Sequence, residues 1–235
     1  MVYTPALTET TSHLTISDDE AHHLLHVLRV KKGQPVEISN GNGYLGKAII
    51  SSVGKKELTL TIQAVTLRPS PLPHIHLIAA PIRANRLEWM VEKATELGFR
   101  SLQLVRTQHT AVKTVNTKRL KRIAISALKQ SRQAYLPTIH PFLEWENWLA
   151  QWSGLPPNSA ALVAHPADHS LSIQRALRPG TQEVFLWVGP EGGFSDEEIA
   201  TLLQCQFKAV TLGHTILRTE TAAMAAIAQV NLLFL

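Results

Sequence analysis

From residue 75 to residue 233, short apolar runs alternate with segments of helical period, and this alternation restricts the possible fold more than any other feature. The apolar runs have the composition of buried strands and lie at 75–80, 102–105, 160–164, 184–188 and 209–212. The segments of helical period lie at 87–97, 117–133, 144–152, 196–204 and 221–233. Strands and helices that alternate in this way form a largely parallel sheet with helices on both faces. We therefore predict an α/β domain whose ligands lie outside the carboxyl ends of its strands.

A proline-rich segment separates this region from the residues before it. In the segment 68–73 (RPSPLP), three prolines at alternate positions stiffen the backbone and disfavour a helix, as expected of an interdomain linker. Before the linker, a capping box at Ser17 (SDDE) begins a helix that ends near Arg29. Strand-like runs follow this helix at 35–39, 47–53 and 57–65. We predict a small β-rich, barrel-like domain at 1–70 and the α/β domain at 74–235.

The composition is that of a globular protein with a small positive charge. Of the 235 residues, 45% are hydrophobic and 17% are charged, which excludes wholesale disorder, and the formal net charge of +5 permits a phosphate-rich partner. The single cysteine, Cys205, excludes an internal disulfide and a zinc site built on several thiolates. The N-terminus lacks the pattern of a signal peptide, and the apolar tail 222–235 is shorter than the roughly 20 residues that cross a bilayer. We therefore expect a soluble, cytoplasmic protein.

A glycine motif at 41–46 (GNGYLG) has the spacing of a dinucleotide-binding loop. In such a loop the glycines lead into a helix whose N-terminus faces the pyrophosphate. Here the next residues, 47–50 (KAII), have the pattern of a strand, and an Asn-Gly pair between two strands is typical of a hairpin. The motif therefore predicts a turn and not a nicotinamide site.

The first predicted helix carries His22, His23 and His26, of which the first and last are spaced to hold a metal ion together. A metal site needs a third ligand and supporting hydrogen bonds, and the sequence offers no obvious partner, so a polar or RNA-facing helix surface is favoured. Basic residues follow this helix at Arg29, Lys31 and Lys32. Phosphate contacts require such a surface, although a solvated face accounts for it equally well.

Two glycine-bearing segments follow predicted strands. The segment 189–195 (GPEGGFS) ends at Ser195, whose spacing to Glu198 forms a capping box for the next helix. Its three glycines allow a ligand to approach the main chain, and it is longer than a short connection requires. The segment 212–221 (LGHTILRTET) gathers charged and hydroxyl side chains at the end of the following strand. Together the two segments predict one composite pocket, although each is also compatible with a plain polar loop.

These two segments resemble the RsmE family, the ribosomal small-subunit RNA uridine-N3 methyltransferases of the knotted SPOUT superfamily. Further stretches agree in order along nearly the whole chain: 20–23 (EAHH), 27–29 (VLR), 86–89 (RLEW), 92–98 (EKATELG), 129–132 (KQSR) and 136–137 (LP). The chain departs from the family at Lys129, where an acidic residue is common, and at Arg132-Gln133, where Gly-Arg is common. It also lacks the family's Arg-Phe-Phe-like N-terminal opening.

The resemblance implies a small PUA-like RNA-binding β-barrel before the linker and a trefoil-knotted α/β methyltransferase domain after it. It also implies S-adenosyl-L-methionine as cofactor, no metal, and a homodimer that acts on 16S ribosomal RNA or the assembled small subunit. The resemblance further implies N3 of uridine 1498 as the target. Two alternatives remain open: a related SPOUT enzyme that modifies transfer RNA, and a non-catalytic RNA-binding assembly factor with the same fold.

The family's functional residues can be carried over onto matching positions of this chain. The residues expected to bind the cofactor are Val163, Ala164, His165, Gly189, Pro190, Glu191, Gly192, Leu212, Gly213, Ile216, Leu217 and Arg218. Basic charge and the surface of the first predicted helix, and not the family's pattern, indicate the residues expected to contact RNA: His22, His23, Arg29, Lys31, Lys32, Lys118, Arg119 and Arg122, with Lys121 beside them.

The chemistry of the reaction suggests roles for the charged groups. N3 of uracil must lose its proton before it attacks a methyl group, and donors near O2 and O4 stabilise the resulting anion. We expect Arg218 to supply these donors, because its planar guanidinium matches such oxygens. Glu191, His214 and Glu220 are candidate bases, with hydroxide or a residue of the partner chain as alternatives. Because pairing buries N3, an unpaired or flipped uridine is expected.

Overall fold

The computed structural model describes residues 1–167 and 169–234, apart from the side chains of Asp18 and Asp19. The chain divides into two compact units, one formed by 1–70 with 125–136 and the other by 71–124 with 137–235. Helix α3 (Thr117–Ser131) crosses from the second unit into the first. The predicted division into folding domains at 1–70 and 74–235 stays a prediction, and the compact units differ from it by the segment 125–136.

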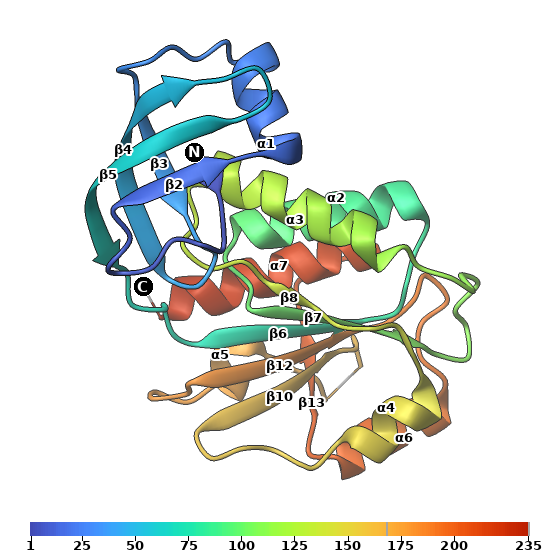
Figure 1. Cartoon of the computed structure of the whole chain (residues 1–235). Helices are drawn as coiled ribbons and strands as arrows, with labels where there is room; N and C mark the ends of the chain where they lie inside the picture. Colours follow the sequence, from blue (N-terminus) through green and yellow to red (C-terminus); the bar gives the residue numbers. More distant parts are fainter. Residues whose placement is uncertain (168, 235) are drawn as a thin grey trace. The chain divides into compact units, whose positions relative to one another are not determined.

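The first unit is built on a five-stranded sheet. Its strands are β1 (Val2–Tyr3), β2 (His13–Ile16), β3 (Pro35–Ser39), β4 (Tyr44–Val53) and β5 (Leu58–Leu67). They pair in the order β1-β3-β4-β5-β2, antiparallel except for β1 beside β3. Alternate side chains such as Ile38, Ile50 and Leu60 are fully buried in the core of the unit, as the period of two along a strand requires. The sheet is curled (Figure 1), and β1 and β2 form its two edges, so the predicted barrel is an open half-barrel.

One helical segment covers part of this sheet. It consists of α1 (Asp18–His22) followed by a π-helical turn, η1 (His23–Val27), whose Leu24 is buried in the core. The Glu20 carboxylate, which the sequence assigns to a capping box, accepts hydrogen bonds from the Tyr3 amide at 3.2 Å and from Lys129 Nζ at 2.8 Å. Glu20 therefore links this helix to β1 and to the C-terminal half of α3.

The glycine motif at 41–46 joins β3 to β4 as an antiparallel hairpin. Gly41 and Gly43 have φ values of +70° and +95°, in the left-handed region that favours glycine. No helix begins here. The predicted turn between two strands is therefore confirmed.

The second unit contains a parallel sheet with the order β11-β13-β10-β12-β6-β7-β8, while β9 pairs with β7. Its strands are β6 (His74–Ala79), β7 (Ser101–Arg106), β8 (Thr138–Ile139), β9 (Leu143–Glu144), β10 (Ser159–Ala164), β11 (Leu171–Ser172), β12 (Glu183–Val188) and β13 (Lys208–Thr211). Its helices, besides the first part of α3, are α2 (Ala84–Glu96), α4 (Trp145–Gln151), α5 (Ile173–Ala176), α6 (Asp196–Gln204) and α7 (Thr219–Leu233). Helices α2 and α7 lie over one face of the sheet, and α4 and α6 lie over the other (Figure 1).

The strands of this sheet are apolar along their length because both faces are covered. Under α4 and α6 the core is aromatic: Trp187 of β12 is fully buried, and Trp148 of α4 meets it edge-on with ring centroids 5.2 Å apart. Phe207 packs against Trp148. Helix α7 is rich in alanine, which permits its close approach to α2 and to β12. None of the described helices is both long and apolar enough to span a membrane.

Candidate functional site

The carboxyl ends of β10, β12 and β13 surround a cavity of about 410 Å³ in the second unit. These strands are neighbours in the sheet, so the loops that follow them meet at one edge. The cavity is lined by Ala164, His165, Pro166, Val188, Gly189, Pro190, Glu191, Gly193, Phe194, Val210, Thr211, Leu212, Gly213, Thr215, Ile216, Leu217, Arg218, Thr219 and Ala222. The structure thus brings together the two glycine-bearing segments in a single pocket.

The first wall is the loop after β12, which the structure holds in a compact turn. The Gly193 amide donates to the Pro190 carbonyl at 2.9 Å, and Ser195 forms both bonds of the predicted capping box with Glu198. Gly189 lies so close to the Phe194 ring that an added Cβ would come within 2.8 Å of it. A side chain at 189 would therefore force the Phe194 ring or the loop to shift.

The second wall is the loop between β13 and α7. Its start is fixed by a hydrogen bond from Gln229 of α7 to the Leu212 carbonyl at 3.0 Å. Its end is fixed where the Thr219 hydroxyl donates to the Gly189 carbonyl at 2.9 Å, which ties α7 to the first wall. Between these two bonds Ile216 is 93% exposed, an unusual setting for a large apolar side chain.

The third wall follows β10. The His165 amide donates to the Val210 carbonyl at 3.1 Å, so this segment continues the sheet into the pocket. Of the twelve residues predicted to bind a cofactor, ten line the cavity. The two others are Val163, which is fully buried one residue before the wall, and Gly192, whose α-carbon faces His109.

The charged residues predicted for catalysis differ in their surroundings. Arg218 lines the cavity and is exposed; its carbonyl accepts a hydrogen bond from the Ala222 amide, but its guanidinium has no hydrogen-bond or ion-pair partner within the described residues. Glu191 also lines it and pairs with Arg86. Glu220 is buried, and its Oε1 lies 3.7 Å from Arg86 Nε while its Oε2 has no hydrogen-bond partner in the described part of the chain. His214 is exposed and does not line the cavity.

Arg86, the first-turn residue of α2 that contacts both carboxylates, was not among the residues that the sequence assigned to the site. The stretch 86–89 is distinguished in the sequence only by its resemblance to the family. Nothing in its local pattern indicates that its partners lie 105 and 134 residues further along the chain.

The residues predicted to contact RNA fall into two sets, one in each unit. In the first unit, His22, Arg29, Lys31 and Lys32 are exposed and His23 is half-buried. The rings of His22 and His26 lie 4.6 Å apart, and among the described residues no third ligand completes a metal-binding group with them.

The second set lies on the first turns of α3, where Lys118, Arg119, Lys121 and Arg122 are exposed. Arg119 donates two hydrogen bonds to Glu88 of α2, at 2.5 and 2.8 Å. This hydrogen bonding lowers the pKa of Glu88 below its ordinary value, against a smaller opposing effect of burial. Part of the positive charge of this set is therefore already paired within the unit.

Comparison with known proteins gives these features a context. Residues 68–231 match the family described as RNA methyltransferase domain, and residues 16–63 match the RNA methyltransferase PUA domain. The ribosomal RNA small subunit methyltransferase E of Rickettsia conorii is 30% identical over 220 residues, which cover 92% of this chain and 88% of that protein. This chain belongs to the ribosomal RNA small subunit methyltransferase E family. The member from Synechocystis is also 30% identical, over 94% of this chain and 73% of that protein.

Solved structures of similar proteins agree with the fold. A methyltransferase E from Neisseria gonorrhoeae, bound to S-adenosyl methionine, superposes with a TM-score of 0.89 at 27% identity and covers 99% of this chain and 97% of that one. A putative methyltransferase from Legionella pneumophila, in complex with the same cofactor, gives 0.87 at 28% identity, over 99% and 96%. The predicted family and the predicted fold class, a SPOUT-type α/β domain preceded by a PUA-like module, are confirmed.

The pocket of this chain suits a nucleoside with an attached polar tail. Its volume falls in the range of small-molecule sites, and its walls combine apolar side chains such as Val188, Leu217 and Ala222 with the main chain of two glycine loops. Apolar walls accommodate an adenine ring, and main-chain amides and carbonyls can bond its edge and the ribose. The residues present therefore fit S-adenosylmethionine.

Proposed function

We propose that this chain is an S-adenosylmethionine-dependent methyltransferase that modifies N3 of a uridine in 16S ribosomal RNA, the uridine that corresponds to the family's U1498. The observation that carries the proposal is the pocket at the carboxyl ends of β10, β12 and β13, formed by two glycine loops that a hydrogen bond joins. Relatives over nearly the whole chain are named ribosomal RNA small subunit methyltransferase E, and two similar solved structures hold the cofactor, which supports the proposal.

The proposed cofactor residues are those predicted from the sequence, with two changes of role. The cavity-lining residues of the loops after β12 and β13 and of the segment 164–166 contact the cofactor directly, largely through the main chain. Val163 supports the third wall from the core, and Gly192 allows the loop to pass His109, where an added Cβ would come within 3.0 Å. We keep the trefoil knot of the superfamily as part of this proposal.

When bound, S-adenosylmethionine supplies an electrophilic methyl group on its sulfonium sulfur. Arg218 binds the uracil oxygens and stabilises the negative charge that develops when N3 loses its proton; its guanidinium is free of partners in the described residues, so it is available for this task. Of the candidate bases, Glu191 lines the cavity and Glu220 has an unbonded buried oxygen. We propose these two carboxylates, and not His214, as the groups that accept the proton.

The substrate is a structured RNA with an unpaired or flipped uridine, because N3 takes part in base pairing. The PUA-like first unit, with Arg29, Lys31 and Lys32, and the basic first turns of α3 contact its phosphates. A homodimer, the assembled small subunit as substrate and a cytoplasmic location complete the proposal, as the resemblance to the family suggests.

Calorimetric titration of the purified protein with S-adenosylmethionine tests the pocket, and methyl transfer to small ribosomal subunits from cells that lack the modification tests the reaction. Mass spectrometry of digested RNA should locate one added methyl group on one uridine. Transfer to tRNA in place of ribosomal RNA would support the related SPOUT activity. Saturable cofactor binding without transfer to any RNA would support a non-catalytic assembly factor.

A further inference from the structure

Arg86 connects two parts of the proposed pocket that are otherwise far apart in the sequence. It lies in the first turn of α2, and its Nη1 pairs with the carboxylate of Glu191 in the loop after β12. Its Nε lies 3.7 Å from the carboxylate of Glu220 in the first turn of α7. One guanidinium thus contacts both of the segments that close the pocket.

The carboxylate of Glu220 makes this contact more than a surface ion pair. The Glu220 side chain is only 11% exposed, and Arg86 is its one ion-pair partner among the described residues. A buried carboxylate loses most of its hydration, and removal of its counter-charge leaves that loss uncompensated. Glu220 is therefore held in place by Arg86 and by the N-terminus of α7, whose dipole favours a negative charge.

Glu191 shows the opposite balance. Its side chain is 50% exposed, in a loop with three glycines that has few side-chain bonds of its own. Besides Arg86, the loop is tied to the rest of the unit by the Thr219 hydroxyl on the Gly189 carbonyl and by His109 Nδ1 on the Gly193 carbonyl at 3.1 Å. The pair with Arg86 is the contact that fixes the middle of the loop.

We propose that Arg86 is a positioning residue that holds the 189–193 loop against the first turn of α7 and thereby sets the shape of the cofactor pocket. This inference rests on the proposed function for the identity of the ligand. Arg86 itself does not line the cavity, so it acts through Glu191 and Glu220 and not on the ligand. Its fork of donors is suited to two carboxylates at once, which a lysine cannot match.

The first test compares cofactor affinity by calorimetry in wild type, Arg86→Gln, Arg86→Lys and Arg83→Gln. Arg83 lies three residues earlier, is exposed and has no ion pair in the described residues, so its replacement is a matched loss of charge. We expect affinity about tenfold weaker in Arg86→Gln, a smaller loss in Arg86→Lys, and no change in Arg83→Gln. Affinity of Arg86→Gln within twofold of wild type would overturn the proposal.

The second test separates positioning from a role in stability alone. Arg86→Gln leaves Glu220 without its counter-charge and lowers the unfolding midpoint, whereas Arg86→Gln with Glu220→Gln removes both charges and should restore the midpoint. Under the proposal, cofactor affinity stays weak in this double variant because Glu191 still lacks its ion pair with residue 86 and the loop is still not held in place. Recovery of affinity together with stability would show that Arg86 is only a counter-charge.

A third measurement needs no cofactor, so it distinguishes failure of this inference from failure of the proposed function. Amide hydrogen exchange of residues 189–193 in the free protein should be faster in Arg86→Gln than in wild type and unchanged in Arg83→Gln. Unchanged exchange in Arg86→Gln would refute the positioning role even if the wild type binds no S-adenosylmethionine. Absence of cofactor binding by a wild type that shows the expected exchange would refute only the proposed function.

Discussion

The two ends of the parallel sheet in the second unit differ in how their polar groups are bonded, and strand β12 contributes to both ends. At the carboxyl ends of β10, β12 and β13, glycine loops surround a cavity, and the Arg218 guanidinium and one carboxylate oxygen of Glu220 have no partner among the described residues. At the amino ends of β6, β7 and β12, polar side chains bond to one another instead. Unused hydrogen-bonding capacity on charged side chains, and not polarity as such, distinguishes the proposed binding site from the network at the opposite end.

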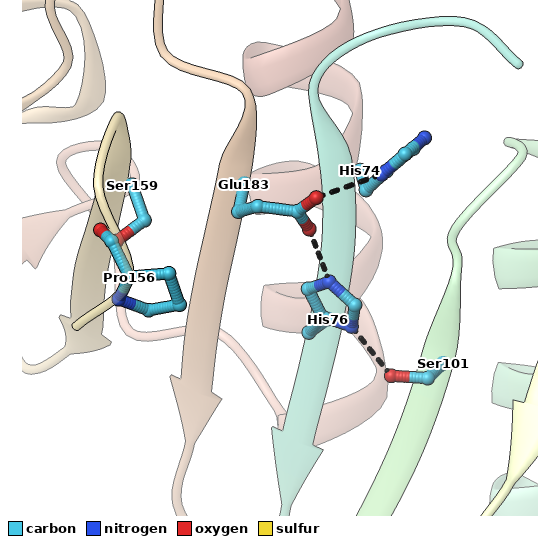
Figure 2. A network of polar contacts seen from close by, with 6 residues as sticks. All are labelled: His74, His76, Ser101, Pro156, Ser159 and Glu183. Atoms are coloured by element: carbon cyan, nitrogen blue, oxygen red, sulfur yellow. Dashed lines mark hydrogen bonds and ion pairs between the residues drawn. The ribbon is translucent and has the colours of Figure 1, made fainter. Parts of the chain in front are cut away.

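The network at the amino ends is centred on Glu183 (Figure 2). Its Oε1 lies 2.9 Å from His74 Nδ1, its Oε2 lies 2.6 Å from His76 Nε2, and His76 Nδ1 lies 2.7 Å from Ser101 Oγ. The His76 ring also stacks on Phe185 with centroids 4.8 Å apart. Both oxygens of the carboxylate and both nitrogens of one imidazole are used, which suits a structural clasp between neighbouring strands.

The largest effect is expected from Arg218→Ala, which should lower methyl transfer about 10²- to 10³-fold, as loss of one donor to a developing anion commonly does. The fold should be unchanged, since the Arg218 side chain is exposed and makes no hydrogen bond within the described residues. Single-turnover transfer to ribosomal subunits, with circular dichroism as a check on folding, measures this. Arg175→Ala, an exposed arginine on α5, is the control, and turnover of Arg218→Ala equal to that of the control would remove Arg218 from the mechanism.

The next effect tests the shape of the carboxyl-end pocket without altering a charge. Gly189→Val places a branched side chain against the Phe194 ring, which an added Cβ already approaches to 2.8 Å. We expect cofactor affinity to fall at least about tenfold, because the loop must shift to relieve the clash. Gly180→Asn is the matched control: its φ of +82° is one that asparagine tolerates, and no atom lies within 4 Å of an added Cβ. Equal affinity in both variants would show that the loop after β12 does not form a wall of the binding site.

The sequence predicted the parallel sheet and the location of the pocket because both depend on local patterns. Strand β3 and helix α6 begin and end at the predicted residues, since a capping box and alternating side chains are read within a few positions. The short edge strands β1 and β2 were missed because two to four residues carry too little periodicity. The π-helical turn at 23–27 was missed because its residues also fit an α-helix.

Contacts between distant residues could not be predicted in the same way. The pairs of Arg86 with Glu191 and of His74 with Glu183 span more than 100 residues, and the return of 125–136 to the first unit has no compositional mark. The direction of each strand determines at which end of the sheet a polar cluster lies. The partners within a cluster follow only from the order of strands in the sheet, which the alternation of elements leaves open.

A third prediction breaks the network at the amino ends and leaves the pocket intact. Burial alone would raise the pKa of Glu183, but hydrogen bonds from His76 and His74 outweigh it and hold the pKa below the ordinary 4.5. A carboxyl group with a lowered pKa stabilises the fold above its unfolded pKa and loses this contribution as the pH falls through the folded pKa. Glu183→Gln should therefore lower the free energy of unfolding at pH 7 by about 1 kcal/mol.

Denaturant unfolding at pH 7 and pH 4 measures this effect, and Glu57→Gln is the control, because the described contacts include no side-chain partner for Glu57. The difference in stability between wild type and Glu183→Gln should shrink at the lower pH. Cofactor affinity should equal that of wild type, because Glu183 and the pocket lie at opposite ends of β12. A tenfold loss of cofactor affinity in Glu183→Gln would show that the Glu183 network and the pocket are energetically coupled. It would contradict the view that the network is only structural.

The smallest expected effect concerns His140. Burial lowers the pKa of this histidine from the ordinary 6.5, and the nearby His76 lowers it further. When the folded pKa of a histidine is lowered, the unfolded chain binds the proton first, so stability is constant above about pH 6.5 and falls as the pH drops below it. His140→Gln should reduce this loss between pH 7.5 and 5.5 by less than about 1 kcal/mol. The window lies above the one in which Glu183 titrates, so the two contributions separate. Thermal unfolding at the two pH values measures this effect, and replacement of the exposed His169 (His169→Gln) is the control. An unchanged pH dependence of stability in His140→Gln would show that His140 is not the group that makes the fold sensitive to acid.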